Sequence, residues 1–163
     1  MFNTNSRSLD SEITLTLVEQ RLAKYLGTSR TAAARDAGVI NCKMSPQSDA
    51  EIDLDGVGAE LAFCRMMNIY PDLSIGARSG GSDCVLAGRT IDVKQTRYKT
   101  GHLLAVRKKS VDPCDLYALM IGAFPTYRFA GMATAEQLFA VDNLHDLGRG
   151  VGYVLSQDAL QKL

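Results

Sequence analysis

The first third of the chain carries apolar residues at the spacing of amphipathic helices. Over residues 10–26 the recurring apolar positions are Leu15, Val18, Leu22 and Leu26. Asp10 or Ser11 can cap such a helix, and Gly27 can end it. Residues 13–17 also alternate between apolar and polar types, which is the pattern of a strand, so a later helix start is the alternative.

Two further helices are predicted before the middle of the chain. Residues 29–37 predict a short helix that Gly38 ends, and the polar residues 41–55 indicate a connector. A longer helix is predicted over residues 54–69, with Glu60 on its mostly apolar face. A carboxylate on such a face needs a polar, cationic or metal partner, which makes Glu60 a candidate functional residue.

The remainder of the chain is dominated by β patterns. The expected strands cover residues 83–87, 90–96, 102–106, 116–124, 127–133 and 153–155. Gly88 and Arg89 predict a hairpin with a type II′ turn between the first two strands. The run 116–124 is apolar enough for a central strand. A short helix after Thr134 and a last helical turn capped by Ser156 complete the prediction.

The predicted turn fixes which side chains share a face of the hairpin. The cross-strand pairs that follow are Ala87 with Thr90, Val85 with Asp92, and Asp83 with Lys94. Because side chains alternate along a strand, Asp83, Asp92 and Lys94 then lie on one face, with apolar residues on the other. Asp83 and Asp92 are expected to be diagonal neighbours.

Two acids and a lysine on one rigid face predict a metal site. Mg²⁺ prefers oxygen ligands and takes only one or two carboxylates, and Mn²⁺ is expected to substitute for it. Such a metal neutralises charge on a phosphate and lowers the pKa of a bound water. Lys94 can orient that water, and Glu60 can bind a second metal or hold a metal-bound water. Alone, the Asp92-Val93-Lys94 triplet is more typical of a solvated ion pair; its conjunction with Glu60, Asp83 and a tight turn favours chemistry.

Length and charge limit the classes of protein to consider. The 163 residues fit one domain, and the net charge of zero gives no overall case for nucleic acid. Residues 78–109 are nevertheless strongly basic, and their acids are Asp83 and Asp92 alone. Such a local patch is sufficient to bind phosphates, although a solvated surface is the simpler interpretation of charge alone.

Other sequence features point to a cytoplasmic protein. No apolar stretch approaches the length of a membrane helix, and the polar start lacks a secretory signal. The four cysteines, Cys42, Cys64, Cys84 and Cys114, are widely spread and include no CxxC pair. They are expected to be reduced thiols in or near the core rather than a zinc site or a disulfide framework.

The residues of the hairpin and of the preceding helix match a known pattern. The matching segments are Gly58-Ala59-Glu60-Leu61-Ala62, Ser82-Asp83 and Asp92-Val93-Lys94-Gln95. At these residues the chain resembles the PD-(D/E)xK nuclease superfamily, in which a helical Glu precedes an Asp on one strand and Asp/Glu-x-Lys on the next. The likeness covers about residues 54–133 and is strongest to small stand-alone nuclease-like proteins of phages and bacteria. Ser82 replaces the Pro of the pattern, at a position that varies widely and takes no direct part in chemistry.

This resemblance implies an α/β fold with a restriction-endonuclease-like core, a mixed and mainly four-stranded central sheet flanked by helices. Residues 51–163 would form this nuclease-like domain, and residues 1–50 an N-terminal helical extension and connector, within one compact domain overall. The implied catalytic residues are Glu60, Asp83, Asp92, Lys94 and Gln95, and the implied metal ligands are Glu60, Asp83, Asp92 and the Val93 carbonyl.

The sequence therefore predicts an Mg²⁺-dependent deoxyribonuclease that hydrolyses phosphodiester bonds, as an endonuclease or an exonuclease. The residues expected to contact DNA are Arg89, Arg97, Lys99, Arg107, Lys108 and Lys109. No nucleotide cofactor is expected, because residues 76–81 lack the Gly-Lys-Ser/Thr ending of a P-loop. A homodimer would suit cleavage of both strands. The alternative is a non-catalytic nucleic-acid-binding or protein-interaction module on the same fold.

Overall fold

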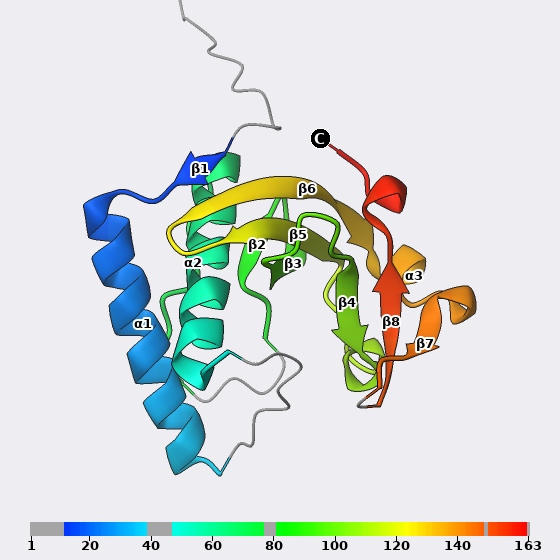
Figure 1. The fold of residues 1–163 in the computed structure, drawn as a ribbon, viewed down its shortest axis with the longest axis horizontal. Coiled ribbons are helices and arrows are strands. Elements are labelled where there is room, and N and C mark those ends of the chain that lie inside the picture. Colours follow the sequence, from blue (N-terminus) through cyan, green and yellow to red (C-terminus); the bar gives the residue numbers. More distant parts are fainter. Residues whose placement is uncertain (1–11, 39–46, 77–80, 149, 163) are drawn as a thin grey trace, which may run out of the picture.

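A five-stranded mixed β-sheet forms the centre of the fold (Figure 1). The structure, a computed structural model, describes residues 12–38, 47–76, 81–148 and 150–162. In spatial order the strands are β1 (Ile13–Thr14), β6 (Thr126–Thr134), β5 (Leu116–Ala123), β3 (Arg89–Thr96) and β2 (Cys84–Leu86). β3 and β5 run parallel, and the other neighbouring pairs are antiparallel. The predicted α/β class with a mixed sheet is confirmed, and β5 is the central strand that its apolar sequence predicted.

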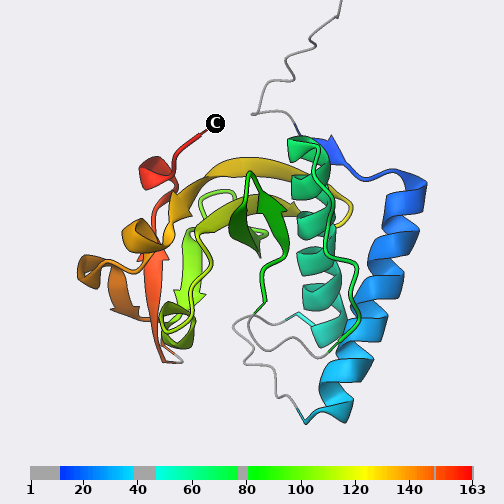
Figure 2. The ribbon, with the colours of Figure 1, turned by 180° about the vertical axis from the view of Figure 1, so that it is seen from behind.

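Two helices lie on one side of this sheet. α2 (Asp49–Met67) packs against the strands, and α1 (Leu17–Asp36) packs beside α2 (Figure 2). Each helix begins with a capping box, formed by Thr16 with Glu19 in α1 and by Ser48 with Glu51 in α2. These reciprocal bonds satisfy backbone N–H groups that have no partner within the helix.

The predicted break at Gly27 is wrong, since α1 runs through it as one helix. Gly27 is buried, and a Cβ built there would lie 3.9 Å from the backbone of Asp53 and Leu54 in α2. The missing side chain thus lets the two helices approach closely, and this packing outweighs the weak helix propensity of glycine. The alternative of a later helix start is confirmed, because Ile13–Thr14 forms the edge strand β1 and the helix begins at Leu17.

A second, three-stranded antiparallel sheet lies on the other side of the central sheet (Figure 1). Its strands, in spatial order, are β4 (Leu103–Val106), β8 (Val151–Leu155) and β7 (Leu144–Asp146). The short helix α3 (Ala135–Leu138) follows β6, and three 3₁₀ segments, η1 (Arg107–Ser110), η2 (Val141–Asn143) and η3 (Gln157–Ala159), connect the elements. β7 was not predicted, because its residues have no strand-like apolar alternation.

The central sheet is covered on both faces, and its side chains divide between two cores. From β5, Leu116, Ala118 and Met120 enter the core beneath α2, while Tyr117, Leu119 and Ile121 enter the core beneath the second sheet. From β3, Ile91 and Val93 point to the α2 core. Asp92 and Lys94 pair in register with Tyr117 and Leu119, so they face the second sheet.

Three of the four cysteines lie in these cores. Cys64, Cys84 and Cys114 are free and buried, as predicted, and Cys42 lies outside the described residues. A hydrogen bond with Cys84, together with burial, raises the pKa of the Cys64 thiol far above its ordinary value. The Cys64 thiol is therefore a protonated packing group. In the part of the chain that the structure describes, no helix is both long and apolar enough to cross a membrane.

Candidate metal and phosphate site

The β2–β3 hairpin has a different turn from the predicted one. Ala87 and Gly88 form the two-residue turn, with φ values of 50° and 79°, and Leu86 pairs with Arg89. Two consecutive positive φ values are the signature of a type I′ turn, which matches the twist of antiparallel strands. The predicted type II′ turn at Gly88-Arg89 is therefore wrong.

The predicted cross-strand pairs are wrong by two positions. The observed pairs are Cys84 with Ile91, Val85 with Thr90, and Leu86 with Arg89. Asp83 lies beyond the last registered pair, and its N–H donates to the Ile91 carbonyl instead of continuing the register. A shift of two positions preserves the faces of the paired residues, and the Asp83 carboxylate still reaches β3 next to Asp92, at the Val93 N–H.

Asp92 is a buried carboxylate held between two lysines. Its side chain is 4% exposed, Lys94 Nζ lies 2.5 Å from its Oδ1, and Lys109 Nζ lies 3.1 Å from its Oδ2. Lys94 comes from the same strand, whereas Lys109 comes from η1, which directly follows β4 of the second sheet. The Asp92 Oδ2 atom is buried and accepts no hydrogen bond of good geometry from the described residues, so its contact with Lys109 is an ion pair only.

The two lysines decide the charge of Asp92. Burial alone would raise the pKa of Asp92, but the ammonium groups of Lys94 and Lys109 outweigh burial and hold this pKa below its ordinary value. Burial likewise lowers the pKa of Lys109, and the charge of Asp92 outweighs it, so that the pKa of Lys109 is raised. Asp92 and Lys109 are therefore both charged at neutral pH.

Asp83 closes the open edge of β3 beside this cluster. Its backbone N–H donates to the Ile91 carbonyl at 2.8 Å, and its Oδ2 accepts from the Val93 N–H at 2.7 Å. The carboxylate thus takes the place of a strand carbonyl where β2 has not yet begun, which satisfies a backbone donor that the sheet would leave unpaired. The Asp83 charge also reaches Lys109, which connects both acids to the same lysine electrostatically.

Glu60 lies in the α2 layer and is held by α1. Its Oε2 accepts from Arg30 Nη1 at 2.9 Å, and the same guanidinium donates to the Asp72 and Ser74 carbonyls. Asp92 and Lys94 face the opposite side of the sheet. Among the described residues no three His, Cys, Asp or Glu side chains are grouped so as to hold a metal ion. The structure therefore brings together Asp83, Asp92 and Lys94 but does not add Glu60 as a third acid of that cluster.

Gln95 also points away from Lys94. By strand alternation it shares the α2 side with Val93, and its Nε2 donates to the Gly122 carbonyl on β5 at 2.5 Å. This contact joins the C-terminal ends of the two parallel strands β3 and β5.

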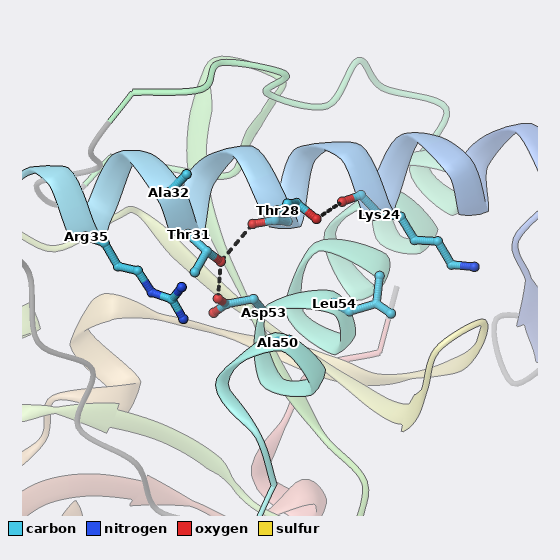
Figure 3. Close-up of a pocket in the computed structure, with 9 residues that line it drawn as sticks. Lys24, Thr28, Thr31, Ala32, Arg35, Ala50, Asp53 and Leu54 are labelled. Atoms are coloured by element: carbon cyan, nitrogen blue, oxygen red, sulfur yellow. Dashed lines mark hydrogen bonds between the residues drawn. The ribbon is translucent and has the colours of Figure 1, made fainter.

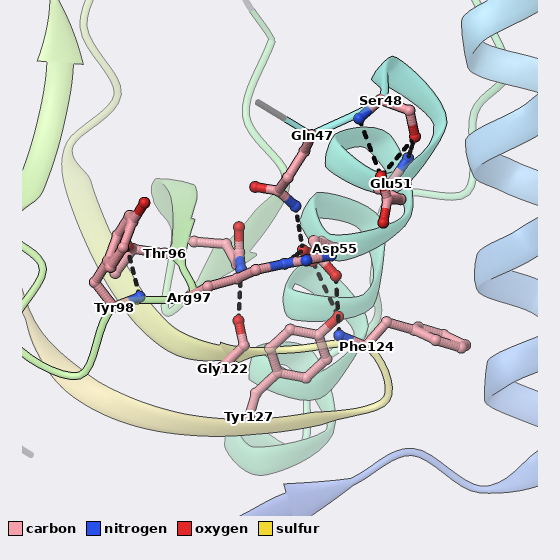
Figure 4. Close-up of polar contacts among 11 residues, drawn as sticks. Gln47, Ser48, Glu51, Asp55, Thr96, Arg97, Tyr98, Gly122, Phe124 and Tyr127 are labelled. Atoms are coloured by element: carbon pink, nitrogen blue, oxygen red, sulfur yellow. Dashed lines mark hydrogen bonds and ion pairs between the residues drawn. The ribbon is translucent and has the colours of Figure 1, made fainter. Parts of the chain in front are cut away.

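Arg97, expected to contact DNA, is bound to a buried acid of α2 (Figure 4). Arg97 Nε lies 2.6 Å from Asp55 Oδ2, and the Asp55 Oδ1 accepts from the Phe124 N–H at 3.0 Å. The Tyr127 hydroxyl donates to the Asp55 carbonyl at 3.1 Å. Asp55 lies where the predicted connector 41–55 and the predicted helix 54–69 overlap, and its spacing from Gly58, Ala59 and Ala62 puts it on the buried helix face.

The other expected DNA contacts divide into two groups. Arg89, Lys99, Arg107 and Lys108 are exposed, as a phosphate-binding surface requires. Lys109 is half-buried in the ion cluster and belongs to the site itself. Nothing in its sequence context distinguished Lys109 from Arg107 and Lys108; only the fold brings η1 against β3.

The oxygens of Asp83 and Asp92 fit a divalent cation in donor type. Mg²⁺ takes one or two protein carboxylates and keeps several waters, and the buried Asp92 Oδ2 has lone pairs that no hydrogen bond from the described residues uses. Both oxygens of Asp92 already contact an ammonium group, so a cation must compete with Lys109 for Oδ2. The oxygen donors therefore suit Mg²⁺, and Lys109 must move away from Oδ2 for the ion to bind there.

A groove of about 530 Å³ lies elsewhere, between α1 and α2 (Figure 3). Lys24 and Arg35 stand towards its two ends, and Thr31 bonds both to the Gly27 carbonyl and to Asp53 between them. Its hydroxyl groups are used in bonds within and between the helices. The groove contains neither acid of the Asp83–Asp92 pair, so it is separate from the candidate site.

Comparison with known proteins identifies the family but no activity. No curated protein and no solved structure matches the chain. One family model matches, and it covers residues 6–162, which is nearly the whole sequence. The chain therefore belongs to DUF5843, a family of unknown function.

Proposed function

We propose that this protein is a divalent-metal-dependent deoxyribonuclease that uses Asp83 and Asp92 to hold the metal and Lys94 to act on the scissile phosphate. The observation that carries the proposal is the buried Asp92 Oδ2, an anionic oxygen that accepts no hydrogen bond from the described residues, beside Lys94 and next along β3 to the position that the Asp83 carboxylate reaches. Removing a carboxylate and two ammonium groups from water costs desolvation free energy that their attraction can fail to recover. A buried cluster of this kind is therefore weak evidence for a purely stabilising role. The arrangement supports a functional interpretation of the motif.

The resemblance to PD-(D/E)xK nucleases extends to the order of elements. α2, β2 and β3 follow one another in the chain, and the acids and Lys94 lie on the hairpin as that pattern requires. We therefore propose a restriction-endonuclease-like core for the central sheet and α2. Glu60 departs from the pattern, since it is paired with Arg30, and we assign the metal to Asp83, Asp92 and the Val93 carbonyl alone.

Each residue of the candidate site has a role in this proposal. Asp83 and Asp92 would hold the metal ion. Mg²⁺ bound there would neutralise charge on the phosphate and supply an activated water. Lys94, fixed on a central-sheet strand, donates to that water or to a phosphate oxygen as charge develops. The exposed cations of η1, Arg107 and Lys108, bind the DNA backbone next to the cluster. Such a substrate implies a cytoplasmic location.

A non-catalytic nucleic-acid-binding module is the second candidate. It is favoured by the complete neutralisation of Asp92, since an acid held by two lysines is also a stable structural ion cluster. The two candidates agree on the basic surface and differ on metal and turnover.

Cleavage of DNA separates the two candidates. Supercoiled plasmid and linear single- and double-stranded DNA are incubated with the wild type in Mg²⁺, Mn²⁺ or EDTA, alongside Asp92→Asn and Lys94→Met. We expect cutting that EDTA stops and that each variant slows at least about 100-fold. Asp142→Asn, which alters an exposed acid on η2, is the matched control and should cut at the wild-type rate. Nicked against linear products would show whether one site acts alone or two act as a pair. Intact DNA that still binds the protein would reject the nuclease and favour the binding module.

A further inference from the structure

Lys109 contacts the Asp92 oxygen that the proposed metal site would use, and the proposed function leaves this contact unexplained. Its ammonium lies 3.1 Å from the Asp92 oxygen that accepts no hydrogen bond from the part of the chain that the structure describes. Lys94 is already bound to the other oxygen at 2.5 Å. One lysine is sufficient to serve as the lysine of the motif, so the second needs a separate account.

The burial of Asp92 explains why a second cation is required in the absence of metal. Asp92 is 3% exposed, and its contact with Lys94 is at Oδ1. Without Lys109, the buried Oδ2 would carry negative charge in a region of low dielectric with no ammonium group beside it, which is strongly unfavourable.

The two lysines are held differently. Lys94 lies within β3, where the strand is hydrogen-bonded to β5 and Lys94 pairs with Leu119. Lys109 reaches the site from η1, a single 3₁₀ turn with no buried residue and no side-chain cap. Its side chain is 29% exposed, so rotation about its own bonds can carry the ammonium into solvent without disturbing the sheet.

From these contacts we propose that Lys109 is an internal counter-cation that occupies the metal position and is displaced when a divalent metal binds Asp92. The inference rests on the proposed metal site. The displaced ammonium joins Arg107 and Lys108 on the exposed side of η1, where it binds a DNA phosphate. Metal binding and DNA binding therefore favour each other. The metal replaces Lys109 as the partner of Asp92, and a DNA phosphate replaces Asp92 as the partner of Lys109.

The first test is metal affinity, which needs no cleavage. Mn²⁺ binding to the purified protein is followed by the spectroscopic signal of free Mn²⁺, for the wild type, Lys109→Met, Lys109→Arg and Lys108→Met. We expect Lys109→Met to tighten Mn²⁺ binding about tenfold or more, because the competing charge has gone. Lys109→Arg keeps the charge and should stay near the wild type, and Lys108→Met, which changes a neighbouring exposed lysine, should alter affinity less than about twofold.

The second test is the salt dependence of DNA binding, measured in a Lys94→Met background so that the DNA stays intact. In EDTA, Lys109→Met should bind DNA like its parent, because Lys109 is then occupied by Asp92. With Mn²⁺ present, the same change should reduce the salt slope by about one contact. Lys108→Met should reduce the slope under both conditions.

The outcomes separate this inference from the proposed function. If the wild type binds Mn²⁺ and cuts DNA but Lys109→Met binds no more tightly than Lys108→Met, the counter-cation is rejected and the nuclease stands. If none of the proteins binds Mn²⁺, the metal site and the counter-cation both fall. Thermal melting of each variant checks that it is folded, and Lys109→Arg keeps the comparison valid if Lys109→Met is not.

Discussion

Replacing Asp55 by alanine should destabilise the protein by about 3 kcal/mol, although Asp55 takes no part in the proposed chemistry. The substitution removes the acceptor of the Phe124 N–H, and a buried donor left without a partner costs about 1–3 kcal/mol. It also removes the ion pair with Arg97, whose side chain is 40% exposed and can be hydrated instead, so this part is worth only about 1 kcal/mol. With a urea m-value of about 2 kcal/mol/M, the midpoint should fall by about 1.5 M.

Urea unfolding followed by circular dichroism measures this change. Asp53→Ala, two residues earlier on α2, is the matched control; its carboxylate bonds to the Thr31 hydroxyl at a partly exposed position, and the cost should stay near 1 kcal/mol. Both changes gain the same helix propensity, so the comparison removes that contribution. Asp55→Asn keeps an acceptor for Phe124 and should lose about half as much as Asp55→Ala. A cost for Asp55→Ala no greater than that for Asp53→Ala would refute the account of this network.

Three further changes test the packing, the turn and an acid outside the proposed metal site. Gly58→Ala places a Cβ 3.0 Å from the Tyr127 ring and against its hydroxyl, so it should cost about 2 kcal/mol of unfolding free energy, whereas Gly56→Ala meets open space and should gain up to about 1 kcal/mol. Ala87→Gly relieves the positive φ of the turn and should raise the melting temperature slightly, while Ala32→Gly on the exposed side of α1 should lower it. Hydrogen bonds from the Thr90 N–H and hydroxyl lower the pKa of Asp115, so the stability that Asp115 contributes is complete above about pH 5 and is lost as the pH falls further. The difference in unfolding free energy between wild type and Asp115→Asn should therefore shrink between pH 5 and pH 2.5, and a constant difference would contradict this origin.

Local patterns in the sequence were sufficient for most elements of the fold. The apolar run of β5 and the alternation in β3 predicted a central strand and a half-polar neighbour, because each pattern reflects burial of that strand alone. The helix α2 was predicted, but its start at Asp49 was placed too late, since acidic residues suit both a connector and a first helical turn. The helix end predicted at Gly27 was wrong because Gly27 packs against Asp53 and Leu54, which are far away in sequence.

The candidate site was predicted in part for the same physical reason. Asp83, Asp92 and Lys94 lie within 12 residues on one hairpin, so local sequence alone could group them, and a register error of two positions left Asp92 and Lys94 on a common face. Lys109 and Arg30 reach their acids from other elements, and no local pattern reports such contacts. Arg97 was assigned to DNA because its partner Asp55 is 42 residues away.

The claim that Asp83 and Asp92 hold the metal is tested most directly by diffraction at the manganese absorption edge, from crystals grown with Mn²⁺. We predict one strong anomalous peak within about 2.2 Å of the Asp92 Oδ2 and beside Asp83, with the Lys109 ammonium moved away from Asp92. A peak bound to other residues, or no peak at Mn²⁺ concentrations that support DNA cleavage, would contradict it.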